Sequence, residues 1–210
     1  MDSLWPHQRK GIEETMALVA RGERAICITS PTGGGKSRIA IELIRRFPSA
    51  VLYTNRKLLT DQLIQVLTGE EMYFGVRASG YDEHLRMGEP VQISSMQTEA
   101  ARVYQRKQWS LHNARLVIVD EAHMQAGATA QRIIADHLAA NAVVVGITAT
   151  PTGLYQRPYT SLVVAGTNSE LRRCGAHVPC SVFAPDEPDL AKIKATPTGE
   201  YDDGSELVTV

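Results

Sequence analysis

Residues 30–37 read Ser-Pro-Thr-Gly-Gly-Gly-Lys-Ser and stand between a short apolar run and an amphipathic stretch. The apolar run at residues 25–29 (AICIT) is typical of a buried strand, and residues 37–47 have the apolar spacing of a helix. Glycines in such a turn let backbone N–H groups close around an anion, and the positive end of the helix adds to the attraction. The stretch therefore predicts a phosphate-binding loop within an α/β domain.

The alternation of strands and helices continues along the chain. Strands are expected at residues 50–54, 91–94, 116–120 and 143–148, and helices at residues 57–68, 96–107 and 128–140. The strands at 116–120 and 143–148 are apolar on both faces, which is typical of parallel strands covered on both sides. Strands separated by helices imply right-handed crossovers. We therefore expect an α/β fold with a doubly wound, mostly parallel sheet flanked by helices.

The pattern changes after Pro151. A short helix is expected there, capped by Asn168 or Ser169 and closed by Gly175, followed by one further strand at residues 178–184. From Pro185 the chain is rich in Pro, Gly, Asp and Glu, and we expect residues 181–210 to be a linker or the start of the crossing to a missing second lobe, and not a second core. The expected domain therefore spans residues 1–180.

The side chains of the phosphate-binding loop point to a nucleotide. Lys36 supplies a positive charge for the β- and γ-phosphates, and the Ser37 hydroxyl is suited to ligate Mg²⁺. Ser30 stands where the strict template has glycine. An ordinary glycine-rich turn is the alternative, but strand, loop, Lys-Ser pair and helix follow in the order that a nucleotide site requires. We assign ATP binding to Pro31, Thr32, Gly33, Gly34, Gly35, Lys36 and Ser37.

The strand at residues 116–120 ends in two carboxylates. Asp120 can hold Mg²⁺ together with Ser37, and Glu121 can orient and deprotonate an attacking water. His123 follows two residues later and is suited to sense the γ-phosphate. An acidic helix start is the alternative for a lone pair of acids, but the phosphate-binding loop upstream favours catalysis. The catalytic candidates are Lys36, Asp120, Glu121 and His123.

The chain resembles a known family at this point. Asp-Glu-Ala-His at residues 120–123 resembles motif II of the DEAH-type superfamily 2 helicases and translocases, and residues 30–37 resemble their motif I. The remaining motifs follow in the family's order at residues 4–8 (glutamine motif), 53–59 (Ia), 93–98 (Ib/Ic) and 146–151 (III). The resemblance covers residues 4–180 and is closest to the XPB-like and type III restriction-like branch, which includes phage helicases. It implies the N-terminal RecA-like P-loop lobe of such a protein.

The resemblance also implies roles for residues outside the two main motifs. Gln8 would read adenine, since an amide carries one donor and one acceptor group. Thr148 and Thr150 of motif III would couple hydrolysis to movement of the lobes. Each of these residues stands at an expected strand end or at the start of the chain.

Contacts to a nucleic-acid backbone are implied by the Ia and Ib/Ic segments. A hydroxyl, backbone amides and cations at a strand-to-helix junction are suited to hold phosphates. An ordinary solvated helix start is the alternative interpretation of the first of these segments. The implied contacts are Thr54, Asn55, Arg56 and Gln97.

Composition sets limits on partners and compartment. The formal net charge is −1, so any nucleic-acid contact depends on local charge. DNA is the expected partner under the resemblance to the helicase family, and the charge itself does not distinguish DNA from RNA. The chain has 3 cysteines, too few and odd in number for a disulfide framework. No apolar run reaches the ~20 residues that span a bilayer, and the start lacks the features of a secretory signal. We expect a cytoplasmic protein (or an intracellular one in a phage host) that is neither secreted nor membrane-bound.

A second RecA-like lobe is expected to complete the catalytic site. Superfamily 2 motors carry their arginine finger on that lobe, and no segment after Pro151 resembles Gln-x-x-Gly-Arg-x-x-Arg. An arginine finger is worth roughly 10³–10⁵ in rate in related phosphoryl transfer. The chain alone is therefore expected to bind ATP·Mg²⁺ and hydrolyse it poorly, with the second lobe supplied in cis or in trans; a fragment of a longer helicase is favoured.

The leading functional hypothesis is the ATP-binding lobe of an ATP-dependent helicase or translocase. A second hypothesis is an ATP-dependent switch or adaptor module, motivated by the missing lobe. A third is the translocating subunit of a restriction system, in which the same motor serves a nuclease. The sequence does not separate DNA from RNA, or unwinding from translocation.

Overall fold

The computed structural model describes residues 4–54, 56–125, 127–153 and 158–178. Asn55, the expected linker at residues 181–210 and most of the strand expected at residues 178–184 lie outside these ranges. Within them, all the strands belong to one sheet of seven strands in the order β3-β4-β2-β5-β6-β1-β7. Every paired neighbour runs parallel, so the sheet is of the kind that the sequence predicts. The strands are β1 (Ala25–Thr29), β2 (Ala50–Tyr53), β3 (Phe74–Arg77), β4 (Val91–Ser94), β5 (Leu116–Asp120), β6 (Val143–Thr148) and β7 (Ser161–Val164).

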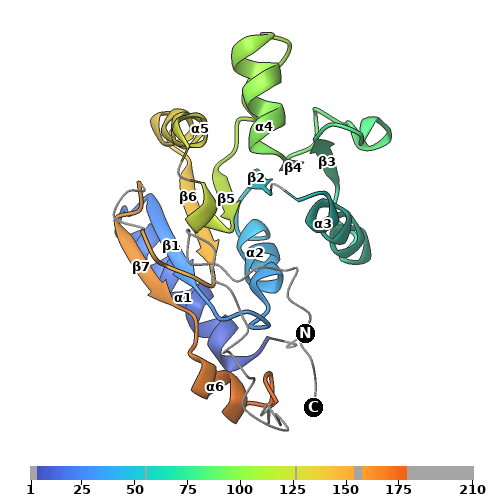
Figure 1. Ribbon diagram of the computed structural model, residues 1–210. Helices are drawn as coiled ribbons and strands as arrows, with labels where there is room; N and C mark the ends of the chain where they lie inside the picture. Colours follow the sequence, from blue (N-terminus) through green and yellow to red (C-terminus); the bar gives the residue numbers. More distant parts are fainter. Residues whose placement is uncertain (1–3, 55, 126, 154–157, 179–210) are drawn as a thin grey trace, which may run out of the picture. The chain divides into compact units, whose positions relative to one another are not determined.

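Helices cover both faces of the sheet, as a doubly wound fold requires (Figure 1). One apolar core joins the sheet to the first three helices, and a second core on the opposite face joins it to α4 and α5. These two layers explain why the central strands are apolar at successive positions. The helices are α1 (Pro6–Ala20), α2 (Lys36–Ile44), α3 (Lys57–Gly69), α4 (Met96–Glu99), α5 (Ala128–Ala139) and α6 (Asn168–Arg173), with π-helical turns at Ala100–Gln105 and 3-10 turns at Asp82–His84 and Ala122–Met124.

The parallel register brings the ends of distant strands together. Thr29 at the end of β1 pairs with Thr148 at the end of β6, and Asp120 at the end of β5 pairs with Ile147. Tyr53 at the end of β2 pairs with Val119. Since carboxyl ends of parallel strands share one edge, the segments that follow them gather there.

Three elements were not expected from the sequence. The long helix α1 escapes detection because its buried side includes His7, Gln8 and Thr15, which hide the apolar period. The edge strands β3 and β7 are four residues long, and β3 contains a glycine and a charged residue. The cap of α6 also differs by one residue: Thr167, and not Asn168 or Ser169, accepts a hydrogen bond from the Glu170 N–H.

A buried tyrosine–histidine pair ties β2 to α5 and makes the fold sensitive to acid. The Tyr53 hydroxyl lies 2.8 Å from His137 Nε2. Burial lowers the pKa of His137 to about 4, helped by His112 and by the positive charge of Arg77, while Asp136 opposes the decrease. Because the folded pKa lies below the unfolded value, the neutral imidazole stabilises the fold above about pH 6.5, and this stability is lost as the pH falls toward 4.

We expect the free energy of unfolding to fall by about 2 kcal/mol between pH 7 and pH 5 through His137 alone. Urea unfolding at the two pH values would measure the change. The His137→Gln variant, which cannot gain a proton there, serves as control, because other titrating groups contribute equally to both proteins. An equal loss of stability in both proteins would contradict the assignment.

Candidate nucleotide-binding site

The phosphate-binding loop needs its three glycines because a different side chain packs against each of them. A Cβ atom at Gly33 would lie 2.9 Å from His177 Nε2, and one at Gly34 would overlap the Ser30 hydroxyl. Gly35, which caps α2 with a φ of 74°, would meet the Gln8 amide in the same way. From the sequence, these glycines are explained by the close approach of phosphate to the backbone. The structure adds a second reason, because protein side chains also leave no room for a Cβ atom at these positions.

Gln8 is buried beneath this loop and uses both ends of its amide within the protein. Its Oε1 accepts from the Trp5 N–H at 3.0 Å, and its Nε2 donates to the Gly34 carbonyl at 3.2 Å. The second lone pair of Oε1 and the second N–H of Nε2 are not used by these two bonds, so an adenine edge could bind there without breaking either of them. In the described structure Gln8 supports the loop directly.

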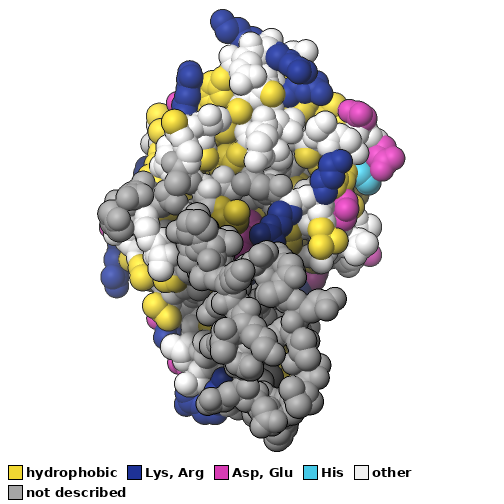
Figure 2. Space-filling model, in the orientation of Figure 1, with side chains coloured by type: hydrophobic (Ala, Val, Ile, Leu, Met, Phe, Trp, Pro, Cys, Tyr) yellow, Lys and Arg dark blue, Asp and Glu magenta, His cyan; other side chains and the backbone are white. Residues whose placement is uncertain are grey.

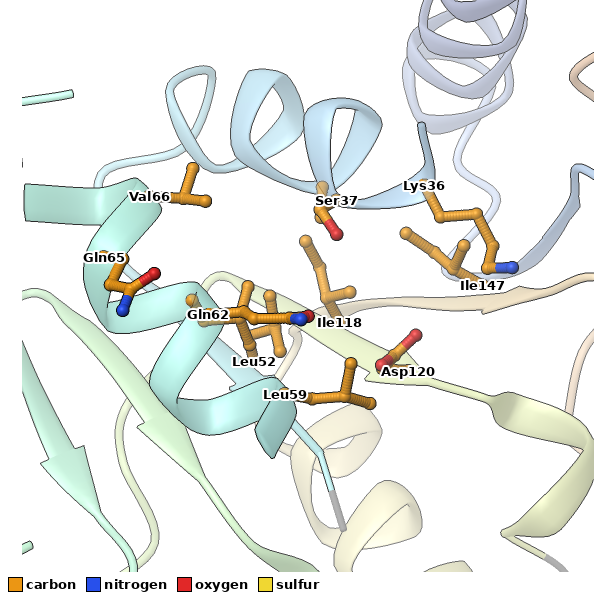
Figure 3. A pocket seen from close by; sticks show the side chains of 12 residues that line it. Lys36, Ser37, Leu52, Leu59, Gln62, Gln65, Val66, Ile118, Asp120 and Ile147 are labelled. Carbon is orange, nitrogen blue, oxygen red and sulfur yellow. The ribbon is translucent and has the colours of Figure 1, made fainter. Parts of the chain in front are cut away.

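Lys36, Ser37 and Asp120 line one cavity of about 220 Å³ between α2, α3 and the strands β2, β5 and β6. Figure 3 shows Lys36 and Asp120 at one side of this cavity, with the Ser37 hydroxyl pointing into it and the glutamines of α3 on the opposite side. Polar side chains of motif I (Lys36 and Ser37) and of motif II (Asp120), which lie far apart in the sequence, thus line the same cavity. The remaining lining is mostly apolar, with Leu52 and Ile118 at its base.

Asp120 is a partly buried carboxylate with a second acid, Glu121, beside it. Burial raises the pKa of Asp120, and the neighbouring Glu121 carboxylate adds to the increase, while Lys36 and Arg56 oppose it. A partly desolvated carboxylate opposite a hydroxyl is a donor set that suits Mg²⁺, which takes few protein ligands and keeps water and phosphate oxygens. No cluster of three His, Cys, Asp or Glu side chains for a protein-only metal site is found among the described residues.

Motif II and motif III are joined by hydrogen bonds at the ends of β5 and β6. Thr148 Oγ1 donates to the Thr150 carbonyl at 3.2 Å and accepts from the Thr150 N–H at 3.0 Å. His123 Nδ1 lies 2.8 Å from the same hydroxyl and 3.4 Å from a Glu121 carboxylate oxygen. The His123 imidazole therefore connects the Glu121 carboxylate of motif II to the Thr148 hydroxyl of motif III.

The residues expected to contact nucleic acid differ in their exposure to solvent. Arg56 and Gln97 are exposed, at the N-terminal ends of α3 and α4. Thr54 is 1 % exposed, and its hydroxyl has no partner among the described residues. Figure 2 shows that lysine and arginine side chains on this face are scattered and do not form one continuous patch. Nucleic-acid contact at Thr54, Asn55, Arg56 and Gln97 stays a prediction.

The buried ion pair between Arg77 and Glu99, next to the Ib/Ic segment, was not predicted from the sequence. Arg77 of β3 donates to both carboxylate oxygens of Glu99, at 2.6 and 3.0 Å, and Ser94 Oγ donates to the same carboxylate at 2.8 Å. Arg77 also donates to the Ser110 carbonyl at 2.6 Å and lies over the Trp109 ring. The pair links β3, the end of β4 and Glu99 at the end of α4, so it supports the segment that contains Gln97. Nothing in the local sequence marks these charges as buried.

The fold and site together define the N-terminal RecA-like lobe of a superfamily 2 helicase-type protein. Residues 2–153 match the sequence profile of the family described as type III restriction enzyme, res subunit, and the chain belongs to this family. No curated protein is significantly similar to the chain over its sequence. Among the described residues, no helix has the length and apolar character needed to cross a membrane.

Solved structures of helicases and a related ATPase share the fold. The helicase domain of Hef from Pyrococcus furiosus aligns with 73 % of this chain at 21 % identity and a TM-score of 0.57. The UvsW helicase of bacteriophage T4 aligns with 78 % at 17 % identity and a TM-score of 0.61. A SWI2/SNF2 ATPase core from Sulfolobus solfataricus, solved in complex with dsDNA, aligns with 75 % at 15 % identity and a TM-score of 0.55. The aligned regions span 38 %, 60 % and 34 % of those chains.

Proposed function

We propose that this chain is the ATP-binding lobe of an ATP-dependent nucleic-acid helicase or translocase, with DNA as the favoured substrate. The observation that carries the proposal is the cavity that Lys36, Ser37 and Asp120 line together. In the proposed role, ATP is hydrolysed when a second RecA-like lobe completes the site, in cis or in trans. The dsDNA complex of the SWI2/SNF2 core supports the choice of DNA by analogy of fold alone.

The residues of the site divide the chemistry among them. Loop N–H groups and the Lys36 ammonium would hold the phosphates, and Ser37 with Asp120 would hold Mg²⁺. When bound, Mg²⁺ neutralises charge on the β- and γ-phosphates. Glu121 would accept a proton from the attacking water, and its carboxylate lies outside the apolar core, where water has access.

Motif III would couple ATP hydrolysis to movement of the two lobes. His123 contacts both Glu121 and the Thr148 hydroxyl, and Thr148 holds Thr150. A shift of Glu121 on hydrolysis would therefore alter the bond network at the end of β6. This arrangement supports the coupling role proposed for Thr148 and Thr150.

The Lys36→Ala variant tests the proposed ATP site. We expect its affinity for ATP·Mg²⁺ to fall about a hundredfold, because a charge-assisted contact to the phosphates is worth about 2–3 kcal/mol. Isothermal titration calorimetry of the 210-residue chain would measure it. Lys107→Ala, which removes an exposed lysine two residues after the π-helical turns, is the matched control. ATP binding that survives in Lys36→Ala as in the control would refute the site.

A restriction-system translocase is the second candidate, and the family match favours it. In that role the same ATP site would drive movement along DNA toward a nuclease. ATP-dependent DNA cleavage by the complete protein with a methyltransferase partner would support this candidate. ATP-dependent strand separation without cleavage would favour the helicase.

A further inference from the structure

Two histidines from distant parts of the chain contact carbonyl groups of the phosphate-binding loop. His177 Nε2 lies 2.7 Å from the Thr32 carbonyl, and His7 Nε2 lies 2.9 Å from the Gly34 carbonyl. A carbonyl oxygen only accepts hydrogen bonds, so each imidazole donates through Nε2–H. His7 belongs to α1, and His177 follows α6, 145 residues after Thr32.

These two bonds help to set where the loop donors point, and Gln8 Nε2 adds a second hydrogen bond to the Gly34 carbonyl. In a trans peptide the C=O of one residue and the N–H of the next point in opposite directions within one plane, and the described part of the chain contains no cis peptide bond. Drawing the Thr32 carbonyl toward His177 therefore turns the Gly33 N–H to the opposite side of the loop. The bond from His7 to the Gly34 carbonyl does the same for the Gly35 N–H.

The segment that carries His177 is itself held in place. Leu171 of α6 is buried, and its carbonyl accepts from the N–H groups of Ala176 at 2.9 Å and His177 at 3.1 Å. Gly175, with a φ of 80°, makes this turn possible. The Leu171 side chain packs beside Gly34, and Cys174 Sγ lies 4.0 Å from His7 Nδ1. The His177 imidazole is thus held next to the loop by α6, whose Leu171 is buried.

We propose that His177, assisted by His7, is a positioning residue that holds the Gly33 and Gly35 N–H groups toward the phosphates of the nucleotide. The inference rests on the proposed ATP site and adds a role for the turn after α6. It also links α6 to the nucleotide, because a displacement of α6 withdraws the donor from the Thr32 carbonyl. Without that donor the Thr32–Gly33 peptide plane is free to rotate.

The test compares three variants of the whole chain in ATP·Mg²⁺ titration calorimetry and thermal unfolding. His177→Ala removes the donor, His177→Gln keeps an N–H donor of similar reach, and His84→Ala removes a histidine on the 3-10 turn at Asp82–His84. We expect His177→Ala to weaken ATP binding about threefold to tenfold, the range of one hydrogen bond. His177→Gln is expected to restore most of the affinity, and His84→Ala to match the wild type.

Each outcome separates the inference from the proposed function. Unchanged ATP affinity in His177→Ala, while Lys36→Ala loses binding, would overturn the role of His177 and leave the ATP site intact. Weakened binding that His177→Gln fails to restore would also overturn it, because the hydrogen-bond donor would then not be the cause. Failure of the wild-type chain to bind ATP would overturn the proposed function itself.

Discussion

Replacing Glu121 with glutamine is expected to lower nucleic-acid-stimulated ATP turnover about a thousandfold while leaving ATP affinity unchanged. A positioned general base contributes roughly 10²–10⁴ in rate, and glutamine cannot accept the proton of the attacking water. Glu121 has a left-handed backbone with a φ of 47°, and glutamine tolerates this conformation about as well as glutamate does. The variant therefore removes the base without changing the shape of the turn.

Turnover is measured in the protein that contains both lobes, and ATP affinity in the 210-residue chain. Glu83→Gln serves as the control, because the Glu83 side chain is 82 % exposed and lies beside the adjacent His84, far along the chain from the proposed ATP site. Turnover in Glu121→Gln equal to that of the control would show that another group activates the water. Loss of ATP binding would show that Glu121 holds the nucleotide instead.

The Glu99→Ala substitution is expected to lower the free energy of unfolding by about 3–5 kcal/mol, because it leaves Arg77 buried without a counter-charge. Glu99 is 0 % exposed and Arg77 is 2 % exposed, so water cannot replace the lost carboxylate without opening the structure. The Ser94 hydroxyl loses an acceptor at the same time. The loss is expected to be largest around β3 and the end of α4.

Urea unfolding at neutral pH measures this change. The matched variant is the double substitution Arg77→Met with Glu99→Leu, which replaces the pair by apolar side chains of similar size. Such replacements are often neutral or stabilising, so the double variant is expected to stay within about 1–2 kcal/mol of the wild type. A double variant as unstable as Glu99→Ala would mean that packing, and not the unpaired charge, accounts for the loss.

Much of the sheet was predictable because its central strands are buried on both faces. The runs at Ala25–Thr29, Leu116–Asp120 and Val143–Thr148 are apolar at successive positions, and the structure has strands with these bounds. The edge strands were not predictable, because an edge position tolerates polar residues and short length. β3 ends in Arg77, whose charge is compatible with burial only through Glu99, 22 residues further along.

The sequence by itself determined the order of the motifs, the phosphate-binding loop and the α/β fold, because these depend on local spacing and on strand–helix alternation. Only the tertiary structure decided which side chains surround the loop. His7 and His177 stand at the two ends of the described chain, and no local pattern indicates that both donate to the same turn. The physical reason is that hydrogen bonds between distant segments follow from packing of α1 and α6 on the sheet, which periodicity does not encode.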